Sequence, residues 1–324
     1  MRARTLLFVA VAVVALVPGW SGYERLALLG PDARITAARV PLDPADPSRR
    51  RLGSLTYMGG VKLRSPDPAF GGFSALHVDG DRVTLLSDGG NIVRFQLKRD
   101  GQVAEPAFAE LPGGPGTGWR KLDRDSEGMA VDPKTRTAWI VFERANAIWR
   151  YGPGLLRPEA SVRPAAMRRW RSNLGAETLV RRRDGSFLVF QESAGGSVLR
   201  DVLGWRGDPT GGREPDARFR YRPPAGFDPV DATELPDGRL LVLSRSYRLP
   251  LRFAAVLEVI DRSALRHGAV VRGRPIARLG APLTHDNMEG VTATVERGRT
   301  IIWLVSDDNR NLLERTLLLK FRLD

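Results

Sequence analysis

Acidic residues recur at nearly even spacing along the chain, and they are the side chains best suited to chemistry. Glu127, Glu177, Asp231 and Glu289 lie 50, 54 and 58 residues apart, each near the start of a similar stretch of sequence. Carboxylates that converge on one point repel each other unless a cation neutralises them. A hard cation such as Ca²⁺ prefers oxygen ligands, and once bound it can polarise a phosphoryl or carbonyl oxygen and activate water. The spacing therefore predicts a shared carboxylate site for Ca²⁺.

A second set of carboxylates ends an apolar run in four of the repeats. This set consists of Asp88, Glu143, Glu192 and Asp307, with Asp308 beside the last. If the repeats surround a common axis, both sets face the same centre. The predicted metal ligands, drawn from both sets, are Asp88, Glu127, Glu177, Asp231, Glu289 and Asp307.

Three kinds of residue are candidates for a direct role in a reaction. Glu127 and Glu289 are each followed by glycine, which permits close approach of the backbone to a ligand, so both are candidate catalytic carboxylates. His285 precedes an Asp-Asn pair in an expected loop and is a candidate acid or base. Arg144 and Arg245 adjoin the ends of the apolar runs and are candidates for binding an anionic substrate.

The same residues also fit a purely structural interpretation. Carboxylates at strand starts can accept hydrogen bonds from backbone N–H groups of the neighbouring repeat and so hold a ring together. Arg144 and Arg245 could then simply pair with these acids. The sequence leaves the two interpretations open.

The elements that position these residues are short strands joined by tight turns. Five copies begin near Ser74, Glu127, Glu177, Asp231 and Glu289, and turns such as Asp79-Gly80, Asp184-Gly185 and Asp237-Gly238 interrupt β-rich runs. A period of about fifty residues made of short strands indicates a β-propeller. The expected fold is all-β, with five blades counted and six as the alternative.

The last repeat stops at its third strand, residues 317–323. The missing outer strand can come from residues 52–63 near the N-terminus. We expect these two segments to pair, since the exchange closes the ring and removes two open sheet edges.

The N-terminus has the features of a targeting segment. Arg2 and Arg4 precede an apolar run over residues 5–17, which is shorter than the roughly 20 residues that a membrane span needs. We expect residues 1–22 to be a signal peptide or an N-terminal anchor, residues 23–51 an extended lead-in and residues 52–324 the propeller. The protein is then exported, either periplasmic or tethered to the membrane and facing the periplasm.

Composition excludes several classes of site. The chain of 324 residues has no cysteine, which rules out disulfides and cysteine-based metal sites or nucleophiles. Neither Ser74 nor Ser126 lies in a Gly-x-Ser-x-Gly elbow, so the sequence does not support a serine-esterase mechanism. The net charge of +13 comes mainly from scattered arginines, with no motif for nucleic-acid binding. We expect a monomer that binds a small anionic or ester substrate and no nucleic acid.

Four blocks resemble a known family. They are Gly71-Gly72-Phe73-Ser74-Ala75-Leu76, Asp125-Ser126-Glu127-Gly128, Asn173-Leu174-Gly175-Ala176-Glu177 and Asp286-Asn287-Met288-Glu289-Gly290-Val291. Together they are similar to the phytase-like domain family, described as having esterase-like activity of phytase, over residues 50–324. The resemblance implies an exported propeller that hydrolyses an ester or phosphoester. The chain lacks the consecutive-Asp calcium signature of calcium-dependent propeller phytases, so the resemblance does not specify phytate.

Three functions are consistent with these observations. The first is a metal-assisted hydrolase of phosphoesters or carboxylic esters. The second is a non-catalytic propeller that binds a ligand or a partner in the cell envelope. The third is a lactonase-like propeller that uses a single Ca²⁺.

Overall fold

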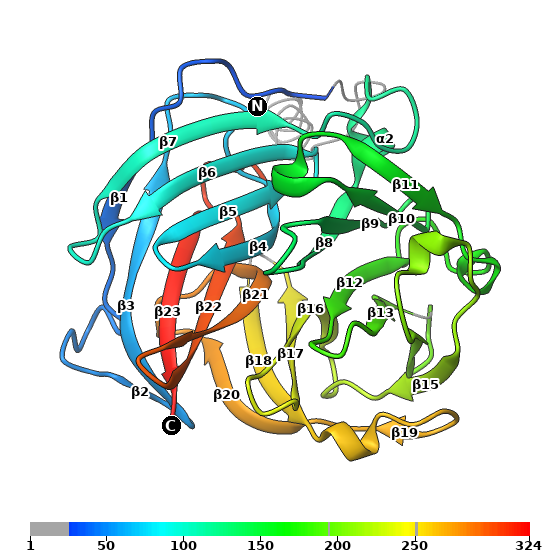
Figure 1. Cartoon of the computed structure of the whole chain (residues 1–324). Helices are drawn as coiled ribbons and strands as arrows, with labels where there is room; N and C mark the ends of the chain where they lie inside the picture. The colour runs from blue at the N-terminus through cyan, green and yellow to red at the C-terminus, as the bar shows by residue number, and fades with distance from the viewer. Residues whose placement is uncertain (1–25, 194, 250–251) are drawn as a thin grey trace, which may run out of the picture.

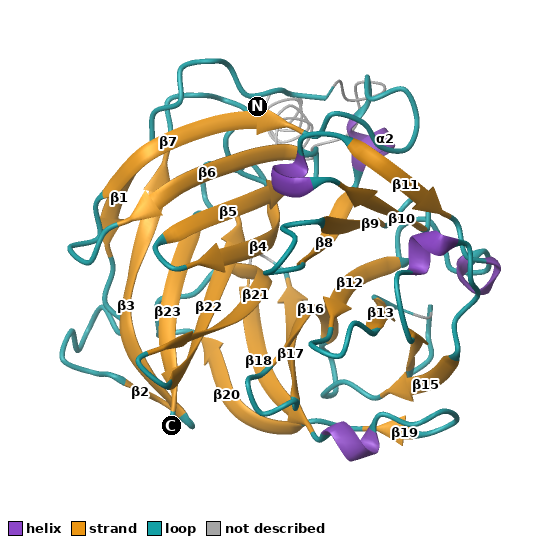
Figure 2. Cartoon of the chain, in the orientation of Figure 1, coloured by secondary structure: helices purple, strands orange, loops and turns teal. Residues whose placement is uncertain are grey.

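The protein is a five-bladed β-propeller in a computed structural model that describes residues 26–193, 195–249 and 252–324. Five twisted sheets stand around a central axis, and helices are confined to short turns in the connections (Figures 1 and 2). The expectation of an all-β propeller is confirmed, and the six-bladed alternative is wrong. The signal peptide or anchor expected over residues 1–22 lies outside the described residues.

Four of the blades are continuous or nearly continuous in sequence. Blade 1 contains β4 (Phe73–Asp79), β5 (Arg82–Ser87), β6 (Asn91–Leu97) and β7 (Val103–Glu110). Blade 2 contains β8 (Ser126–Val131), β9 (Ala138–Phe142), β10 (Ala147–Tyr151) and β11 (Pro158–Val162). Blade 3 contains β12 (Ala176–Arg181), β13 (Phe187–Gln191), β14 (Arg200–Trp205) and β15 (Ala217–Tyr221), with β19 (Val270–Val271) added in parallel. Blade 4 contains β16 (Asp228–Glu234), β17 (Leu240–Arg248), β18 (Arg252–Ile260) and β20 (Arg274–Gly280).

Blade 5 joins the two ends of the described chain. Its strands from the C-terminal part are β21 (Asn287–Glu296), β22 (Arg299–Asp307) and β23 (Leu317–Leu323). Its outer strands, from the N-terminal part, are β3 (Leu55–Arg64) and β1 (Thr36–Arg39), with β2 (Arg51–Leu52) also paired to β3. Strand β3 runs antiparallel to β23, so the predicted pairing of residues 52–63 with the last strand is confirmed. Strand β1 lies in the expected lead-in and β2 spans its boundary with the propeller, and both extend this sheet.

The helical elements are single turns in the connections. They are α2 (Lys121–Arg124) and the 3₁₀ turns η1 (Pro153–Leu155), η2 (Ala165–Met167), η3 (Pro209–Gly211) and η4 (Arg262–Ala264). Among the described residues, no helix has the length and apolarity required to cross a membrane.

The core lies between neighbouring blades. Apolar side chains on facing sheets interdigitate, as at Trp139 of blade 2 and Phe187 of blade 3, whose rings meet edge-on with centroids 4.9 Å apart. The innermost strands β4, β8, β12, β16 and β21 contact one another in sequence, and β21 contacts β4 to complete the ring. Burial on both faces explains why the second strands are almost continuously apolar.

A β-bulge interrupts the start of every innermost strand. In each blade the pairing with the second strand skips one residue, and the skipped residues are Ser74, Glu127, Glu177, Val230 and Glu289. A bulge leaves one residue outside the ladder and redirects its side chain. Five equivalent positions therefore surround one end of the axis, which we call the mouth.

Candidate functional site

Three of the five bulge positions carry glutamate, and these glutamates converge at the mouth. Repulsion from Glu289 contributes to the raised pKa values of Glu127 and Glu177, and repulsion from Glu127 contributes to that of Glu177. Glu177 and Glu289 are buried and Glu127 is partly buried. The ring geometry expected from the repeat spacing thus brings these three residues together.

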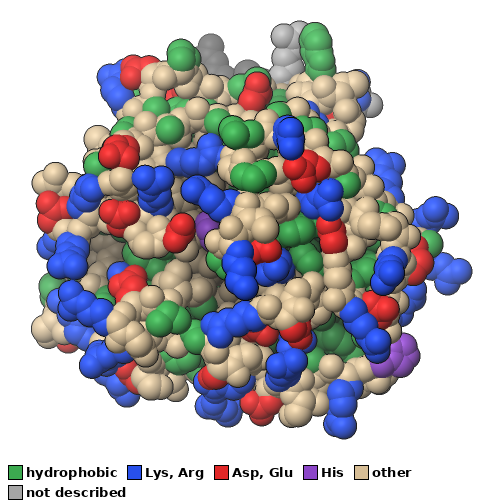
Figure 3. Space-filling view, in the orientation of Figure 1, with side chains coloured by type: hydrophobic (Ala, Val, Ile, Leu, Met, Phe, Trp, Pro, Cys, Tyr) green, Lys and Arg blue, Asp and Glu red, His purple; other side chains and the backbone are tan. Residues whose placement is uncertain are grey.

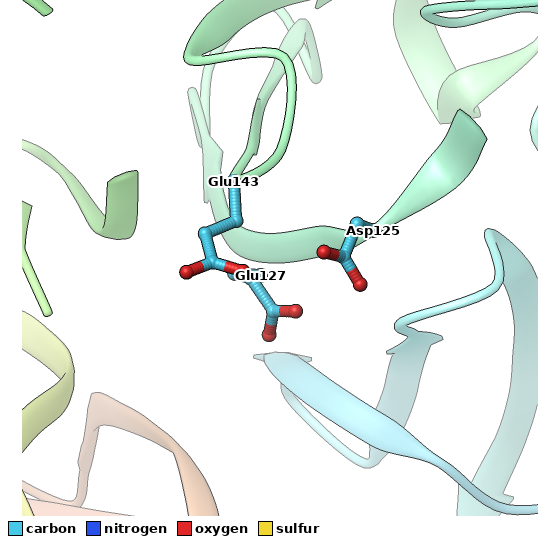
Figure 4. A group of neighbouring side chains, drawn as sticks. All are labelled: Asp125, Glu127 and Glu143. Carbon is cyan, nitrogen blue, oxygen red and sulfur yellow. The ribbon is translucent and has the colours of Figure 1, made fainter. Parts of the chain in front are cut away.

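Glu127 and Glu177 belong to a larger arc of carboxylates on blades 2 and 3. In one group, Asp125, Glu127 and Glu143 each have a carboxylate oxygen within 4.8 Å of the others, and in a second group so do Glu143, Glu177 and Glu192. Figure 4 shows the first group, with the carboxyl groups of Glu143 and Glu127 close together and Asp125 beside them. Glu143 is common to both groups, so the five residues form one continuous cluster. We call this cluster the acidic arc.

The middle of the acidic arc has no cationic partner. Among the residues that the structure describes, the ion pairs reach only its ends: Arg144 Nε lies 3.0 Å from Asp125 Oδ2, and Arg245 Nη2 lies 3.8 Å from Glu192 Oε1. Glu143 does accept a hydrogen bond of 2.9 Å from the backbone N–H of Gly175 in the next blade. Glu127 and Glu177 are left to repel their neighbours.

The electrostatics of the acidic arc follow from burial and this repulsion. Burial raises the pKa of Glu127 and of Glu177 well above the ordinary value, and neighbouring carboxylates add to the effect. Burial also raises the pKa of Glu143 to about 8, although the Gly175 N–H opposes the shift. Burial raises the pKa of Glu192 to about 7, against the influence of Arg245. Near neutral pH the arc therefore retains protons that a bound cation would displace.

The rest of the mouth, on blades 4, 5 and 1, has two of its carboxylates, Glu289 and Asp88, paired with cations. Arg245 Nη1 lies 2.6 Å from Glu289 Oε1, and also donates to Asn287 Oδ1 at 2.8 Å. Asp88 is contacted by Lys121 Nζ at 2.5 Å and by Arg310 Nη2 at 3.3 Å. We call Asp88, Glu289 and Asp307, with Arg245, Lys121 and Arg310, the paired side of the mouth.

Arg245 is the principal cation of this side. Burial alone would lower its pKa, but Glu289, Glu177 and Glu192 raise it overall, so it stays charged. Burial raises the pKa of Glu289, and the positive charge of Arg245 lowers it and so opposes this rise. Asp307, which accepts a hydrogen bond from the Asn309 N–H, has its pKa raised well above the ordinary value by burial and by repulsion from Asp88.

Asp231 differs from the three glutamates with which the sequence repeats align it. The bulge in blade 4 falls on Val230, so Asp231 is shifted by one residue and returns to the ladder opposite Leu243. Its Oδ2 accepts a 2.7 Å hydrogen bond from Val291 N–H of blade 5, and its Oδ1 accepts one of 2.8 Å from Ala232 N–H. Oδ2 therefore joins blades 4 and 5, and Oδ1 is used within its own strand, which corresponds to the structural interpretation.

The glycines after Glu127 and Glu289 serve packing between blades. A Cβ on Gly128 would lie 2.7 Å from Leu179 N of blade 3, and a Cβ on Gly290 would lie 3.3 Å from Leu76 N of blade 1. The expectation that these glycines permit close approach of a ligand is wrong, because neighbouring innermost strands already occupy that space.

Two other candidates lie at the margin of the site. His285 Nδ1 is 2.6 Å from Leu283 O, and Arg315 donates to the His285 carbonyl; the histidine is in neither carboxylate group. Arg144 is exposed and paired with Asp125 at one end of the acidic arc.

Several residues of the mouth were absent from the predicted metal ligands. Asp125 lies in the same sequence block as Glu127, and Glu143 and Glu192 end second strands, so a signal for all three was present in the repeats. Lys121 and Arg310 come from long loops without a repeated pattern, and nothing in the sequence connects them with Asp88.

A separate cavity lies on the opposite face of the ring. It has a volume of about 240 Å³ and lies between blades 1 and 2, lined by His77, Arg94 and Leu155 among others. It is reached from the turns that join first and second strands, away from the mouth. We assign the candidate site to the mouth because the unpaired carboxylates gather there.

The family model described as "Phytase-like: Esterase-like activity of phytase" matches residues 68–310. The chain belongs to this family. The match includes all five bulge positions and every residue of the acidic arc, so the site described above is part of the phytase-like domain.

Other comparisons give only distant similarity. No curated protein matches the chain. Among solved structures, glutaminyl cyclase of Myxococcus xanthus is 12% identical, with a TM-score of 0.45 over 78% of this chain and 91% of that chain. A putative 6-phosphogluconolactonase of Bacteroides fragilis is 12% identical, with a TM-score of 0.37 over 90% of this chain and 82% of that chain. At these values neither structure indicates what the phytase-like propeller binds.

The acidic arc has the chemistry of a site for a hard cation. Its donors are carboxylate oxygens from five residues, and the arc contains neither thiolate nor imidazole, which suits Ca²⁺ or Mg²⁺ better than softer metals. Buried carboxylates without a positive partner are costly, and a divalent ion would remove that cost. The residues present therefore fit a site for a hard divalent cation centred on Glu127, Glu143 and Glu177.

Proposed function

We propose that this phytase-like propeller is a metal-assisted hydrolase of phosphoesters or carboxylic esters, with its site at the mouth. The observation that carries the proposal is the acidic arc, two overlapping carboxylate groups whose central members have no cationic partner. Asp125, Glu127, Glu143, Glu177 and Glu192 would hold a divalent cation such as Ca²⁺. When bound, such an ion supplies a Lewis acid for a phosphoryl or carbonyl oxygen and lowers the pKa of water.

The paired side supplies the remaining functions. Glu289 lies across the mouth, and Arg245 favours its ionised form, so Glu289 is the carboxylate best suited to accept a proton from water. Arg245 Nη2 is 3.8 Å from Glu192, beyond hydrogen-bonding distance, and can donate to an anionic group of the substrate. His285 and Arg144 belong to neither carboxylate group and take no part in the proposed step.

The test measures calcium binding and ester hydrolysis on the same purified protein. The purified protein is assayed with p-nitrophenyl phosphate and p-nitrophenyl acetate, with Ca²⁺ and with a chelator. We expect turnover that the chelator abolishes, and Glu127→Gln should reduce both calcium binding and turnover at least about a hundredfold. Glu110→Gln is the matched control, because Glu110 is exposed at the outer strand β7 and should change neither quantity.

A second function has its own supporting observation. Asp231 and Glu143 hold neighbouring blades together through backbone N–H groups, so part of the acidic set is structural. A non-catalytic propeller that binds an ion or ligand is therefore the alternative. Stoichiometric calcium binding without turnover of either ester would favour this alternative, whereas absence of calcium binding would contradict the metal site itself.

A further inference from the structure

Large apolar side chains are exposed at the loop tips that surround the mouth. The loop from blade 1 to blade 2 exposes Trp119 to 76%, and the loop between β22 and β23 exposes Leu312 and Leu313 to 102% and 71%. Val198, in the corresponding loop of blade 3, is 62% exposed, and Tyr247, near the end of strand β17 in blade 4, is 48% exposed. These loops all lie at the end of the axis where the innermost strands begin.

The opposite face differs. The large apolar side chains exposed there among the described residues, Leu156, Val270 and Val295, are isolated on separate blades. Figure 3 shows basic and acidic side chains interspersed over the visible surface, with apolar groups scattered between them. Single exposed apolar residues are ordinary, but a ring of them on one face indicates an interaction surface.

Hydrogen bonds to two aspartates fix the loops that carry these tips. Asp308 accepts hydrogen bonds from Gly72 N–H at 3.1 Å and from Thr316 Oγ1 at 2.7 Å, which fixes the base of the loop that carries Leu312. Asp123 accepts hydrogen bonds from Thr117 and Gly118 next to Trp119. The apolar tips are therefore presented to solvent by anchored loops.

Basic residues occupy the remaining part of the same face. The loop from blade 2 to blade 3 exposes Arg163, Arg168, Arg169 and Arg171. Within the described parts of the chain, the ion pairs include none of these four guanidinium groups. Apolar tips beside free arginines are the combination that favours an anionic lipid surface.

The described part of the chain begins at this face. Leu26 N–H donates to Trp119 O at 3.0 Å, so the described chain starts next to the exposed tryptophan. The apolar run ends at Val17, nine residues earlier.

We propose that the mouth face docks on an anionic phospholipid bilayer, with the apolar loop tips in the interface and the arginines of residues 163–171 against the headgroups. A bilayer fits better than a second copy of the chain, because the apolar groups stand on separate tips around a recessed acidic centre. The mouth then opens toward the membrane. This docking does not depend on the proposed hydrolysis, since it concerns only the rim.

The absence of cysteine permits a direct test on the full chain. Leu312→Cys and Leu156→Cys each receive one polarity-sensitive fluorophore and are mixed with phosphatidylcholine vesicles with or without phosphatidylglycerol. Leu156, 78% exposed on the opposite face, is the matched control. We expect a blue shift of the label at residue 312 with phosphatidylglycerol vesicles and no shift at residue 156.

Charge-reversal variants distinguish vesicle binding through the loops from vesicle binding through the N-terminal run. Arg168→Glu with Arg169→Glu should weaken binding to phosphatidylglycerol vesicles at least about tenfold. Arg266→Glu with Arg272→Glu, exposed on the opposite face, should leave binding unchanged. Co-sedimentation without a response at residue 312 would overturn the proposal, because the N-terminal run alone would then hold the protein. Absence of binding, or a label at residue 312 already shielded in a dimer before vesicles are added, would overturn it equally.

Discussion

The two sides of the mouth carry similar carboxylates but differ in whether a cationic side chain pairs with them. On the paired side, Arg245, Lys121 and Arg310 lie against Glu289 and Asp88, so the protein supplies its own counter-charge. On the acidic arc, Glu177 is buried and Glu127 is partly buried, both beside other acids and without a cation. The paired side thus contributes to the folded ring, whereas the arc reduces its stability until an external cation binds. Stability and ligand binding are divided between neighbouring blades of one ring.

The comparison predicts the largest effect at Arg245. Arg245→Met leaves Glu289 buried without its partner, and the loss of one member of a buried ion pair costs about 3–5 kcal/mol of unfolding free energy. Arg144→Met is the matched control, since Arg144 is exposed and its pair with Asp125 should be worth no more than about 1 kcal/mol. Urea denaturation measures both. Equal losses for the two variants would show that the paired side has no special role in stability.

The pH dependence of stability should reveal the arc. The folded-state pKa values of Glu143 and Glu192, about 8 and about 7, lie above the ordinary value of 4.5. The folded protein therefore binds protons more tightly than the unfolded chain, so their stabilising effect is complete below pH 4.5 and is lost as the pH rises to 8. In chelator, we expect Tm to fall by about 5 °C or more over this range, and Ca²⁺ should restore it at pH 8. A Tm that rises with pH in chelator would contradict the assignment.

Asp231 provides a test of a carboxylate that is structural. Asp231→Asn retains one acceptor and turns an NH₂ group toward a backbone N–H, which should cost about 1–2 kcal/mol. Calcium affinity should not change, because both oxygens of Asp231 are already used within the ring. Thermal unfolding and calcium titration would measure the two quantities, and a large loss of affinity would return Asp231 to the metal site.

The smallest expected change in stability has the opposite sign. At alkaline pH, where the Glu127 carboxyl ionises, Glu127→Gln removes one unpaired charge, so in chelator it should raise the free energy of unfolding by about 1 kcal/mol. The same variant should lose most of the stabilisation that Ca²⁺ gives the parent protein. Thermal unfolding with and without Ca²⁺ separates the effects. If Glu127→Gln destabilises the protein in chelator, Glu127 forms a favourable contact within the ring.

The sequence predicted the ring better than it predicted the chemistry at its centre. Hairpin turns and apolar second strands define five blades, and the short last repeat predicts closure by residues 52–63, because these features depend on local pattern and on the removal of sheet edges. The bulge in each innermost strand has no such signal. The sequence alignment placed Asp231 opposite Glu127, but the bulge in blade 4 falls one residue earlier, on Val230. In a strand, a shift of one residue moves the side chain to the other face.

The cations of the mouth were harder still to predict. Lys121 and Arg310 reach Asp88 from long loops whose course depends on tertiary packing. The pairing of Arg245 with Glu289 joins blades 4 and 5 across a separation of 44 residues, and could be inferred only as one of several possible pairs. Which carboxylates remain unpaired follows from these contacts, so the acidic arc became visible only in three dimensions.

The bulges make the mouth a set of five interchangeable positions. Because each bulge is a property of the backbone, the residue that it presents can change while the ring remains the same. Ser74 and Val230 occupy the two positions without a glutamate. One substitution at either position would add a carboxylate ligand without rebuilding a blade. Related propellers could thus diverge in the ions and substrates they accept through single codon changes, with the strands that carry those residues left untouched.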